Sequence, residues 1–282
     1  MIPYDFEYYK PSTIQEALNL FVELNKRGRK PVYFSGGTEI ITLGRLNLVT
    51  GDAVIDLKEI PECNRYQVVE EHLLIGSTNP LSKIEDTNLF PLLSKTVSEI
   101  ADRTSRNKIT VGGNICGQIF YREAVLPFLL CNSVLVIAGI EGIKQVSIME
   151  IFLEKLVLKN GEFLVQIVTE QKYLNSPFIS IKRRRQWKTG YPLVTVAAIK
   201  VNNKIRIAIS GLTTYPFRST AFEETLNNLN LSFDVRITTA IEQLKIPILN
   251  DTEGSSDYRL FVLKNTIEDV LTQLGGRGNA NI

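Results

Sequence analysis

The 282-residue chain has few of the side chains that hold metals or form cross-links. Its three cysteines, Cys63, Cys116 and Cys131, lie far apart with no Cys-x-x-Cys pair, too few and too scattered for a disulfide framework or an iron–sulfur cluster. His72 is the only histidine, which argues against a catalytic zinc site and a Ser-His-Asp triad. Redox chemistry here would therefore need a cofactor that takes no cysteine or histidine ligands.

The chain also lacks a strong net charge and a long apolar run. A formal charge of +2 gives no strong attraction to nucleic acid or anionic membranes, and we interpret the isolated basic run KRRRQWK (182–188) as a solvated or subunit-facing patch. No apolar run reaches the roughly 18 residues of a spanning helix, and the polar, aromatic start MIPYDFEYYK is not typical of a secretory signal. We expect a cytoplasmic protein with no nucleic-acid partner and no membrane span.

Hydrophobic periodicity predicts alternating helices and strands, and thus an α+β fold. The first helix is expected after a Ser12 or Thr13 cap, with Glu16 in capping-box register and Gly28 at its end. Further helices are predicted at 89–102, in the first half of 124–139 and at 146–155, and strands at 31–37, 52–57, 66–76 as a hairpin, and 162–169. Beyond Pro177, three strand-like runs with a turn at Asn202 and Asn203 precede helical runs, which predicts a sheet covered by helices.

Two glycine pairs stand out against this background. The first glycine segment (Tyr33–Ile40) reads YFSGGTEI, and the second glycine segment (Ile109–Gly117) reads ITVGGNICG. Glycine permits positive φ and close approach of backbone, and consecutive N–H groups in such loops can converge on an anion. Each pair alone favours an ordinary turn. Two pairs, each followed by a small polar residue, suit the pyrophosphate of a dinucleotide, although neither matches a Rossmann or P-loop motif.

The order of these motifs resembles a known family. The segments FEYYKPSTIQEALNL, SGGTEI and ITVGGNI, Pro127 in the following helix, and the C-terminal DTEGSSDYRLFVLKNTIEDVL are similar to the FAD-binding medium subunit of molybdenum hydroxylases, the xanthine dehydrogenase and carbon monoxide dehydrogenase family. The resemblance covers nearly the whole chain. It implies a two-subdomain FAD-binding fold of the PCMH/vanillyl-alcohol-oxidase type, with a C-terminal α+β domain that closes over the flavin.

The resemblance also implies domain limits. Residues 1–174 are expected to form the FAD-binding domain, its two α+β subdomains split near 57–62. Residues 175–275 are expected to form the C-terminal domain, and 276–282 a flexible tail.

FAD contacts are implied for 17 positions by the resemblance. They are Val32, Tyr33, Phe34, Ser35, Gly36, Gly37, Thr38 and Glu39 around the first glycine segment, Thr110, Gly112, Gly113 and Asn114 in the second, and Ile100, Glu123, Leu164, Lys182 and Tyr191 elsewhere. Ile100 and Tyr191 are expected to cover the two flavin faces and Leu164 to touch the adenine through its backbone. Glu123 stands where the family usually has aspartate, and Ile119 and Phe120 replace the usual Ser-Pro, so the chain departs from the pattern here.

The implied function is electron transfer through bound FAD. A partner large subunit would carry molybdopterin and a partner small subunit 2Fe–2S clusters, and this chain would pass electrons to NAD or another acceptor. No metal site and no catalytic side chain are expected in this chain. Two alternatives stay open: a stand-alone FAD-dependent oxidoreductase of the same fold, and an assembly subunit that has lost FAD.

Overall fold

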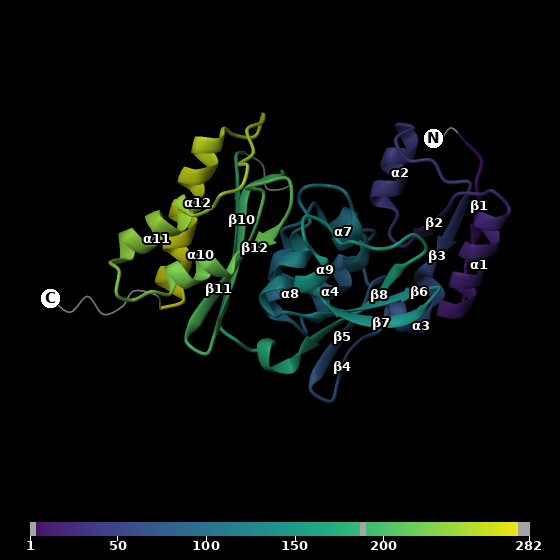
Figure 1. Ribbon diagram of the computed structural model, residues 1–282, viewed down its shortest axis with the longest axis horizontal. Helices are drawn as coiled ribbons and strands as arrows, with labels where there is room; N and C mark the ends of the chain where they lie inside the picture. The colour runs from purple at the N-terminus through teal and green to yellow at the C-terminus, as the bar shows by residue number, and fades with distance from the viewer. Residues whose placement is uncertain (1–3, 187–189, 276–282) are drawn as a thin grey trace. The chain divides into compact units, whose positions relative to one another are not determined.

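The computed structural model describes residues 4–186 and 190–275, which pack into two compact units (Figure 1). The first unit comprises the chain up to Thr87, Arg103–Gly117 and Ser133–Gln171, and the second Asn88–Asp102, Gln118–Asn132 and the chain from Lys172. The predicted tail at 276–282, and residues 187 and 188 of the basic run, lie outside the described residues. The domains expected from the sequence are continuous stretches of chain, whereas each unit combines several separate stretches. The expected domain limits stay a prediction.

The first unit contains two sheets. Its elements are β1 (Glu7–Tyr9), α1 (Ile14–Lys26), β2 (Pro31–Phe34), α2 (Thr38–Arg45), β3 (Ala53–Asp56), η1 (Leu57–Glu59), α3 (Pro61–Asn64), β4 (Tyr66–Val69), β5 (His72–Gly76), α4 (Leu81–Thr87), α6 (Arg103–Arg106), α7 (Val111–Cys116), β6 (Val134–Gly139), β7 (Gly142–Ser147), α9 (Ile148–Ile151) and β8 (Phe163–Glu170). The smaller sheet is parallel in the order β1-β3-β2, and the larger is antiparallel in the order β4-β5-β8-β6-β7.

Helix α1 links the two sheets of this unit through one apolar core. Its buried residues Ala17, Phe21 and Leu24 pack in a cluster with side chains of β3 and of the larger sheet, among them Ile55 and Val165. As predicted, the Thr13 side chain caps the helix by accepting from the Glu16 N–H at 3.1 Å. Because β2 and β3 run parallel, their carboxyl ends meet at one edge of the small sheet, and this edge carries the first glycine segment.

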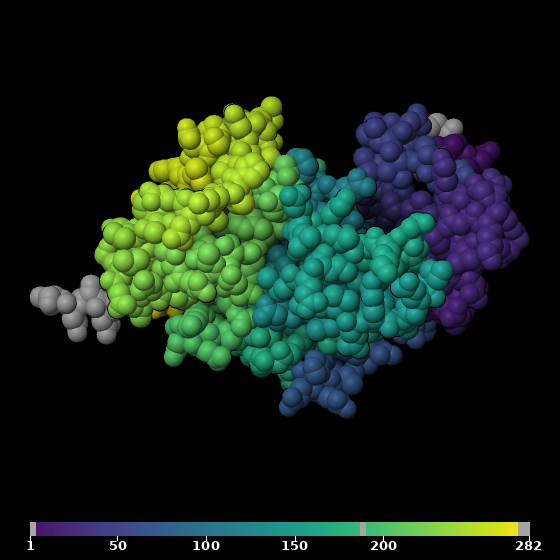
Figure 2. Space-filling model, viewed as in Figure 1, coloured from purple at the N-terminus to yellow at the C-terminus, as the bar shows by residue number. Residues whose placement is uncertain are grey.

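The second unit is one antiparallel sheet with helices on both faces. Its elements are α5 (Pro91–Ser98), η2 (Glu123–Val125), α8 (Leu126–Leu130), β9 (Phe178–Arg184), β10 (Pro192–Val201), β11 (Lys204–Ser210), β12 (Phe217–Arg218), α10 (Thr220–Leu226), α11 (Phe233–Glu242) and α12 (Ser256–Gln273), and η3 (Gln171–Tyr173) leads into it. The sheet order is β12-β11-β10-β9. Val194, Val196 and Ala198 pack into the cluster with α10, α11 and α12, whose surface is green to yellow in Figure 2. Helices α5 and α8 pack on the sheet as well.

Most predicted elements are confirmed, including the hairpin of β4 and β5 and the Asn202–Asn203 turn, where both residues take positive φ. The helix expected at 89–102 is shorter, Pro91–Ser98, and Ala101 just beyond it has a φ of 47°, which no right-handed helix accommodates. The helix expected at 146–155 has only Ile148–Ile151, since the residues before it belong to β7.

A buried arginine ties α12 to the sheet. Arg259 has no exposed surface and donates to the carbonyl oxygens of Leu193 and Gly211, both at 2.7 Å, and to Asp251 Oδ1 at 2.6 Å. Asp251 also accepts from the Glu253 and Gly254 N–H groups. These contacts give the sequence DTEGSSDYR a structural reason: the aspartate, the glycine and the arginine close one polar turn under the start of α12.

Removing this carboxylate should weaken the fold in a pH-dependent way. Burial raises the pKa of Asp251, but the hydrogen bond and charge of Arg259 outweigh it, so the pKa lies below its ordinary value. The stabilisation is therefore present above the unfolded pKa of about 3.9 and is lost as pH falls through the folded value. We expect Asp251→Asn to lower the free energy of unfolding by about 1.5–3 kcal/mol at pH 7, and by less near pH 3.

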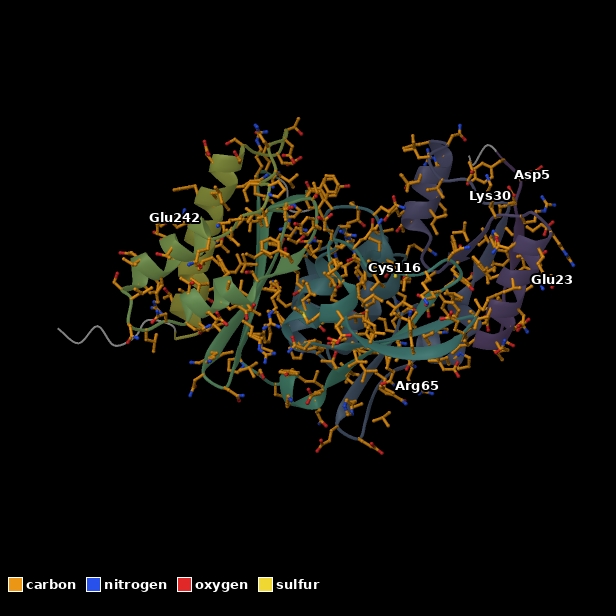
Figure 3. The ribbon with its side chains drawn as sticks, in the orientation of Figure 1. Asp5, Glu23, Lys30, Arg65, Cys116 and Glu242 are labelled. Carbon is orange, nitrogen blue, oxygen red and sulfur yellow. The ribbon has the colours of Figure 1, made fainter. Side chains whose placement is uncertain are left out.

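Urea unfolding at both pH values measures this difference. The matched control is Glu242→Gln, at an exposed carboxylate at the end of α11 (Figure 3), which should stay within about 0.5 kcal/mol of the wild type. An equal loss for Asp251→Asn at pH 3 and pH 7 would contradict the assigned role of the charge.

Candidate functional site

The two glycine segments meet in the first unit. A Cβ atom on Gly36 would lie 2.0 Å from the carbonyl oxygen of Lys108, so no side chain fits between them. The Ser35 hydroxyl donates to Thr110 Oγ1 at 3.0 Å. Gly36 is thus required by the close approach of the Lys108 backbone, and this approach places the two segments side by side.

The first glycine segment has the geometry of an anion-binding nest. Gly37 takes φ 71° and ψ 0°, the left-handed region, and Thr38 then begins α2 in the right-handed region. This left–right alternation turns successive N–H groups toward one point, and a helix N-terminus adds to the positive potential there. Within the described chain, the N–H groups of Gly36, Gly37 and Thr38 make no hydrogen bond. We call residues 36–38 the nest.

The second glycine segment forms a short helix, so the prediction of a loop there is wrong. Residues Val111–Cys116 form the short helix α7, capped by the Thr110 side chain. The amides are used inside the protein: Gly112 N–H donates to Ser77 O at 2.8 Å, Gly113 N–H to Thr110 Oγ1 at 3.1 Å, and Asn114 N–H to Thr110 O at 2.9 Å. Gly112 lacks room for a side chain because a Cβ there would lie 2.7 Å from Ser77 O.

An ion-pair cluster that the sequence analysis did not identify lies beside the nest. The ammonium of Lys58 contacts Asp56 Oδ2 at 2.5 Å and the carbonyl oxygen of Ser35 at 3.0 Å. The buried Asp56 carboxylate also accepts from Tyr8 Oη at 2.5 Å, and this hydrogen bond is the main reason that the pKa of Tyr8 rises to about 12. The sequence signal was present, since Asp56 and Lys58 sit at the carboxyl end of β3, next to the end of β2.

In the second unit, two predicted FAD contacts, Glu123 and Lys182, meet beside Thr195. Lys182 on β9 and Glu123 on η2 form an ion pair of 2.7 Å whose side chains are only 4% and 2% exposed. Thr195 on β10 donates to the other carboxylate oxygen at 2.5 Å, and Lys182 also donates to the Glu99 carbonyl at 2.9 Å. Burial lowers the pKa of the Lys182 ammonium, and the charge of Glu123 opposes that shift. Glu123 and Lys182, both expected to contact FAD, therefore contact each other.

The remaining predicted residues fall into both units. Leu164 lies on β8 in the first unit and is buried, with its backbone paired to Ile137 of β6. Ile100 and Tyr191 belong to the second unit, where Ile100 is buried and Tyr191 is 53% exposed. The Tyr191 ring stacks on Tyr121 with centroids 4.6 Å apart. Cys116, at the end of α7, is exposed (Figure 3).

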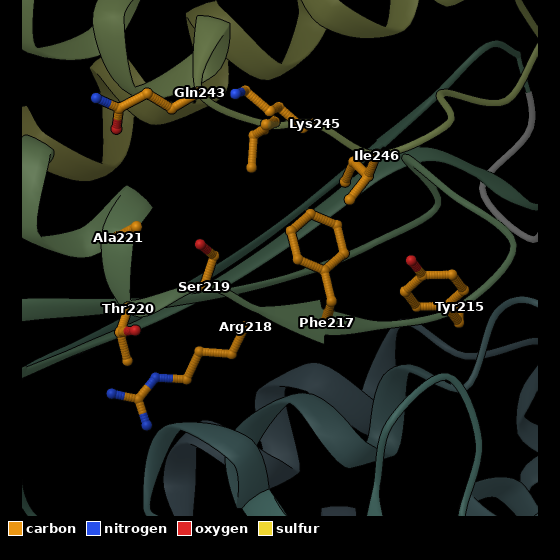
Figure 4. A pocket seen from close by; sticks show the side chains of 10 residues that line it. Tyr215, Phe217, Arg218, Ser219, Thr220, Ala221, Gln243, Lys245 and Ile246 are labelled. Carbon is orange, nitrogen blue, oxygen red and sulfur yellow. The ribbon is translucent and has the colours of Figure 1, made fainter.

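Of two hollows in the protein, one lies apart from the predicted FAD contacts and the other includes some of them. An open groove of about 410 Å³ in the second unit is lined by Tyr215 and by residues 217–221 and 243–246, and it includes none of the predicted FAD contacts (Figure 4). Its Arg218 is already paired with Glu223 at 2.7 Å. A smaller hollow of about 180 Å³ in the first unit has apolar walls that include Tyr8, Phe34 and Ile40, next to the nest.

The described residues contain no group of three or more His, Cys, Asp or Glu side chains placed to hold a metal ion. Across residues 4–186 and 190–275, no helix combines the length and the apolar character needed to cross a lipid bilayer.

Comparisons with known proteins agree on one family. The profile described as "FAD binding domain in molybdopterin dehydrogenase" matches residues 4–169. The chain is 25% identical to the glyceraldehyde dehydrogenase medium chain of Sulfolobus acidocaldarius, covering 94% of this chain and 96% of that one. It is 23% identical to the xanthine dehydrogenase FAD-binding subunit of Escherichia coli, with 97% and 99% covered. Carbon monoxide dehydrogenase from Hydrogenophaga pseudoflava has a chain of similar fold, with a TM-score of 0.85, 22% identity, and 98% and 99% covered.

The Glu123–Lys182 pair should behave as one buried unit. Lys182→Met leaves a carboxylate buried without its counter-charge, so we expect a loss of about 3–5 kcal/mol in the free energy of unfolding. Combining it with Glu123→Gln should cost less than the sum of the two single changes, because each single change already breaks the same pair. A double-mutant cycle in urea measures this coupling, and additive losses would show that the pair is not coupled.

The two glycine segments should respond differently to alanine. Gly36→Ala forces the first segment away from the Lys108 carbonyl, and we expect a loss of about 1–3 kcal/mol and a displaced nest. Gly113→Ala meets only the Thr110 hydroxyl at 2.8 Å and gains about 1 kcal/mol of helix propensity, so it should be nearly neutral. Thermal unfolding compares them, and an equal effect of both changes would contradict this distinction.

Proposed function

Because the chain belongs to the family of FAD-binding domains of molybdopterin dehydrogenases, we propose that it is the FAD-carrying electron-transfer subunit of a multi-subunit molybdenum hydroxylase. One observation carries the proposal beyond the family match: the nest offers the N–H groups of Gly36, Gly37 and Thr38 with no protein acceptor in the described chain. An anion is the natural acceptor for converging amides, and the two phosphates of FAD supply one.

The nest and its surroundings divide the work of holding the cofactor. In our proposal the N–H groups of residues 36–38 bind the pyrophosphate, while the second glycine segment supports the first by contact, since its own amides are used within the protein. The FAD contacts expected at Val32–Glu39, Ile100, Thr110, Gly112, Gly113, Asn114, Glu123, Leu164, Lys182 and Tyr191 stay predictions. No side chain of this chain acts as a nucleophile or a general base in this scheme.

The electron route requires partner chains. FAD, when bound, takes up two electrons and releases them singly or as a hydride. We propose that the electrons come from 2Fe–2S clusters of a small subunit, which receives them from a molybdopterin-containing large subunit, and that they leave to NAD or another acceptor. The names of two relatives, a medium chain and an FAD-binding subunit, support a role within such an assembly. We place the assembly in the cytoplasm.

Substrate choice belongs elsewhere in this assembly. The names of the two relatives contain different substrates, glyceraldehyde and xanthine, and yet both relatives align with nearly all of this chain. One fold thus accompanies chemically unlike substrates, which is expected when the substrate is oxidised in a partner subunit. We therefore assign no substrate pocket to this chain.

The proposal predicts that the purified full-length chain is yellow. It should carry about one FAD per chain, which heat releases, and a colourless preparation should regain flavin absorbance when FAD is added. Co-expression with the genes of its partner subunits should give a complex in which substrate reduces the flavin.

Two results would point to the alternatives. Reduction of the flavin by a small substrate in the isolated chain would indicate a stand-alone oxidoreductase. A chain that joins the complex but neither contains nor accepts FAD would indicate an assembly subunit and would overturn the proposed function.

A further inference from the structure

We propose that Lys58 is a positioning residue of the nest, one that sets the conformation of residues 35–37 and adds its positive charge beside the bound phosphates. This inference rests on the proposed function, because it concerns how the first glycine segment holds a phosphate-containing cofactor. It assigns a role to a side chain that lies outside both glycine segments.

The first step is the anchoring of Lys58 itself. Asp56 is 1% exposed, and its carboxylate accepts from the Lys58 N–H at 3.1 Å and from the Lys58 ammonium at 2.5 Å. Tyr8 Oη, on the neighbouring strand β1, donates to the same carboxylate. Three donors on one buried carboxylate hold its orientation, and Asp56 in turn holds the lysine in a single place at the end of β3.

The second step connects Lys58 to the nest by two contacts. Its ammonium donates to the Ser35 carbonyl at 3.0 Å, which fixes the peptide directly before Gly36. It also lies 4.8 Å from the centre of the Phe34 ring, a cation–π distance. The same ring lies against Gly37, where a Cβ would lie 2.1 Å from Phe34 Cζ. Through these two contacts the lysine orients Phe34 and Ser35, the residues that precede the nest.

The third step is charge. The Lys58 side chain is 41% exposed although Asp56 is buried, so the ammonium stays in contact with solvent. Two of its three N–H groups are used, by Asp56 and Ser35. Because the C=O and N–H of a trans peptide point in opposite directions, the ammonium lies on the other side of the Ser35–Gly36 peptide from the Gly36 N–H, and it acts on a bound phosphate through its charge. Lys182 contrasts with it, since that ammonium is almost fully buried against Glu123.

The test measures the affinity of the full-length chain for FAD, after removal of bound flavin, by quenching of flavin fluorescence, and for ADP by competition. Lys58→Met keeps the stem of the side chain but removes its charge and donors. We expect it to weaken both FAD and ADP by tenfold or more and to reduce the dependence of FAD affinity on salt. Lys58→Arg should restore affinity to within about threefold of the wild type, since it keeps a charged donor.

The matched control is Lys159→Met. Lys159 belongs to the same unit and pairs with Glu141 at 3.2 Å, but both are exposed and neither contacts a glycine segment. It should leave FAD and ADP affinity unchanged. If Lys58→Met does not fold, as thermal unfolding would reveal, Lys58→Gln serves instead, because it removes the charge and keeps a donor for Ser35.

Each outcome separates this inference from the proposed function. If the wild type binds FAD and a folded Lys58→Met or Lys58→Gln chain binds it equally well with the same salt dependence, Lys58 has no such role and the proposed function stands. If affinity falls but the salt dependence is unchanged and Lys58→Arg fails to restore it, the residue acts only in folding, and the inference is wrong. A wild-type chain that binds neither FAD nor ADP overturns both.

Discussion

The approach of Gly36 to the carbonyl oxygen of Lys108 is the constraint on which the candidate site depends. A Cβ at residue 36 would lie 2.0 Å from that oxygen, so only glycine allows the two segments to touch. Once they touch, the Ser35 and Thr110 hydroxyls meet, and Gly37 can turn into the left-handed region at the start of α2. The nest is thus a consequence of packing between two pieces of backbone, which leaves the N–H groups of residues 36–38 without an acceptor in the described chain.

The two glycine pairs show that one sequence pattern can serve two purposes. In the second segment, the N–H groups of Gly112 and Gly113 donate to Ser77 and Thr110. These hydrogen bonds stabilise the protein and leave neither N–H group available to bind an anion. In the first segment, the N–H groups of residues 36–38 have no acceptor in the described chain. A similar contrast separates the lysines: Lys58 keeps an exposed ammonium, whereas Lys182 is buried against Glu123.

The sequence predicts the α+β class and nearly all of the elements, because these depend on local patterns of apolar, capping and turn residues. It does not predict that residues 88–102 and 118–132 pack with the C-terminal sheet. A signal for this existed in the nearly continuous apolar run PLVTVAAI (192–199), which is typical of a strand covered on both faces, and all eight of these residues of β10 are buried. Asp56 and Lys58 are neighbours in the sequence, but Tyr8 joins them only through the pairing of β1 with β3, which the sequence does not show.

Glu123 shows how a departure from the family pattern can be understood in physical terms. Its carboxylate reaches both the Lys182 ammonium and the Thr195 hydroxyl from η2, and these two residues lie directly opposite each other on β9 and β10. A side chain shorter by one methylene would have to bring η2 closer to the sheet to make the same two contacts. The extra methylene therefore lets Glu123 connect η2 to the sheet through these two contacts. Phe120, three residues earlier, is exposed and takes no part in them. The departure affects how the second unit is held together, while the nest belongs to the first unit and is built without it.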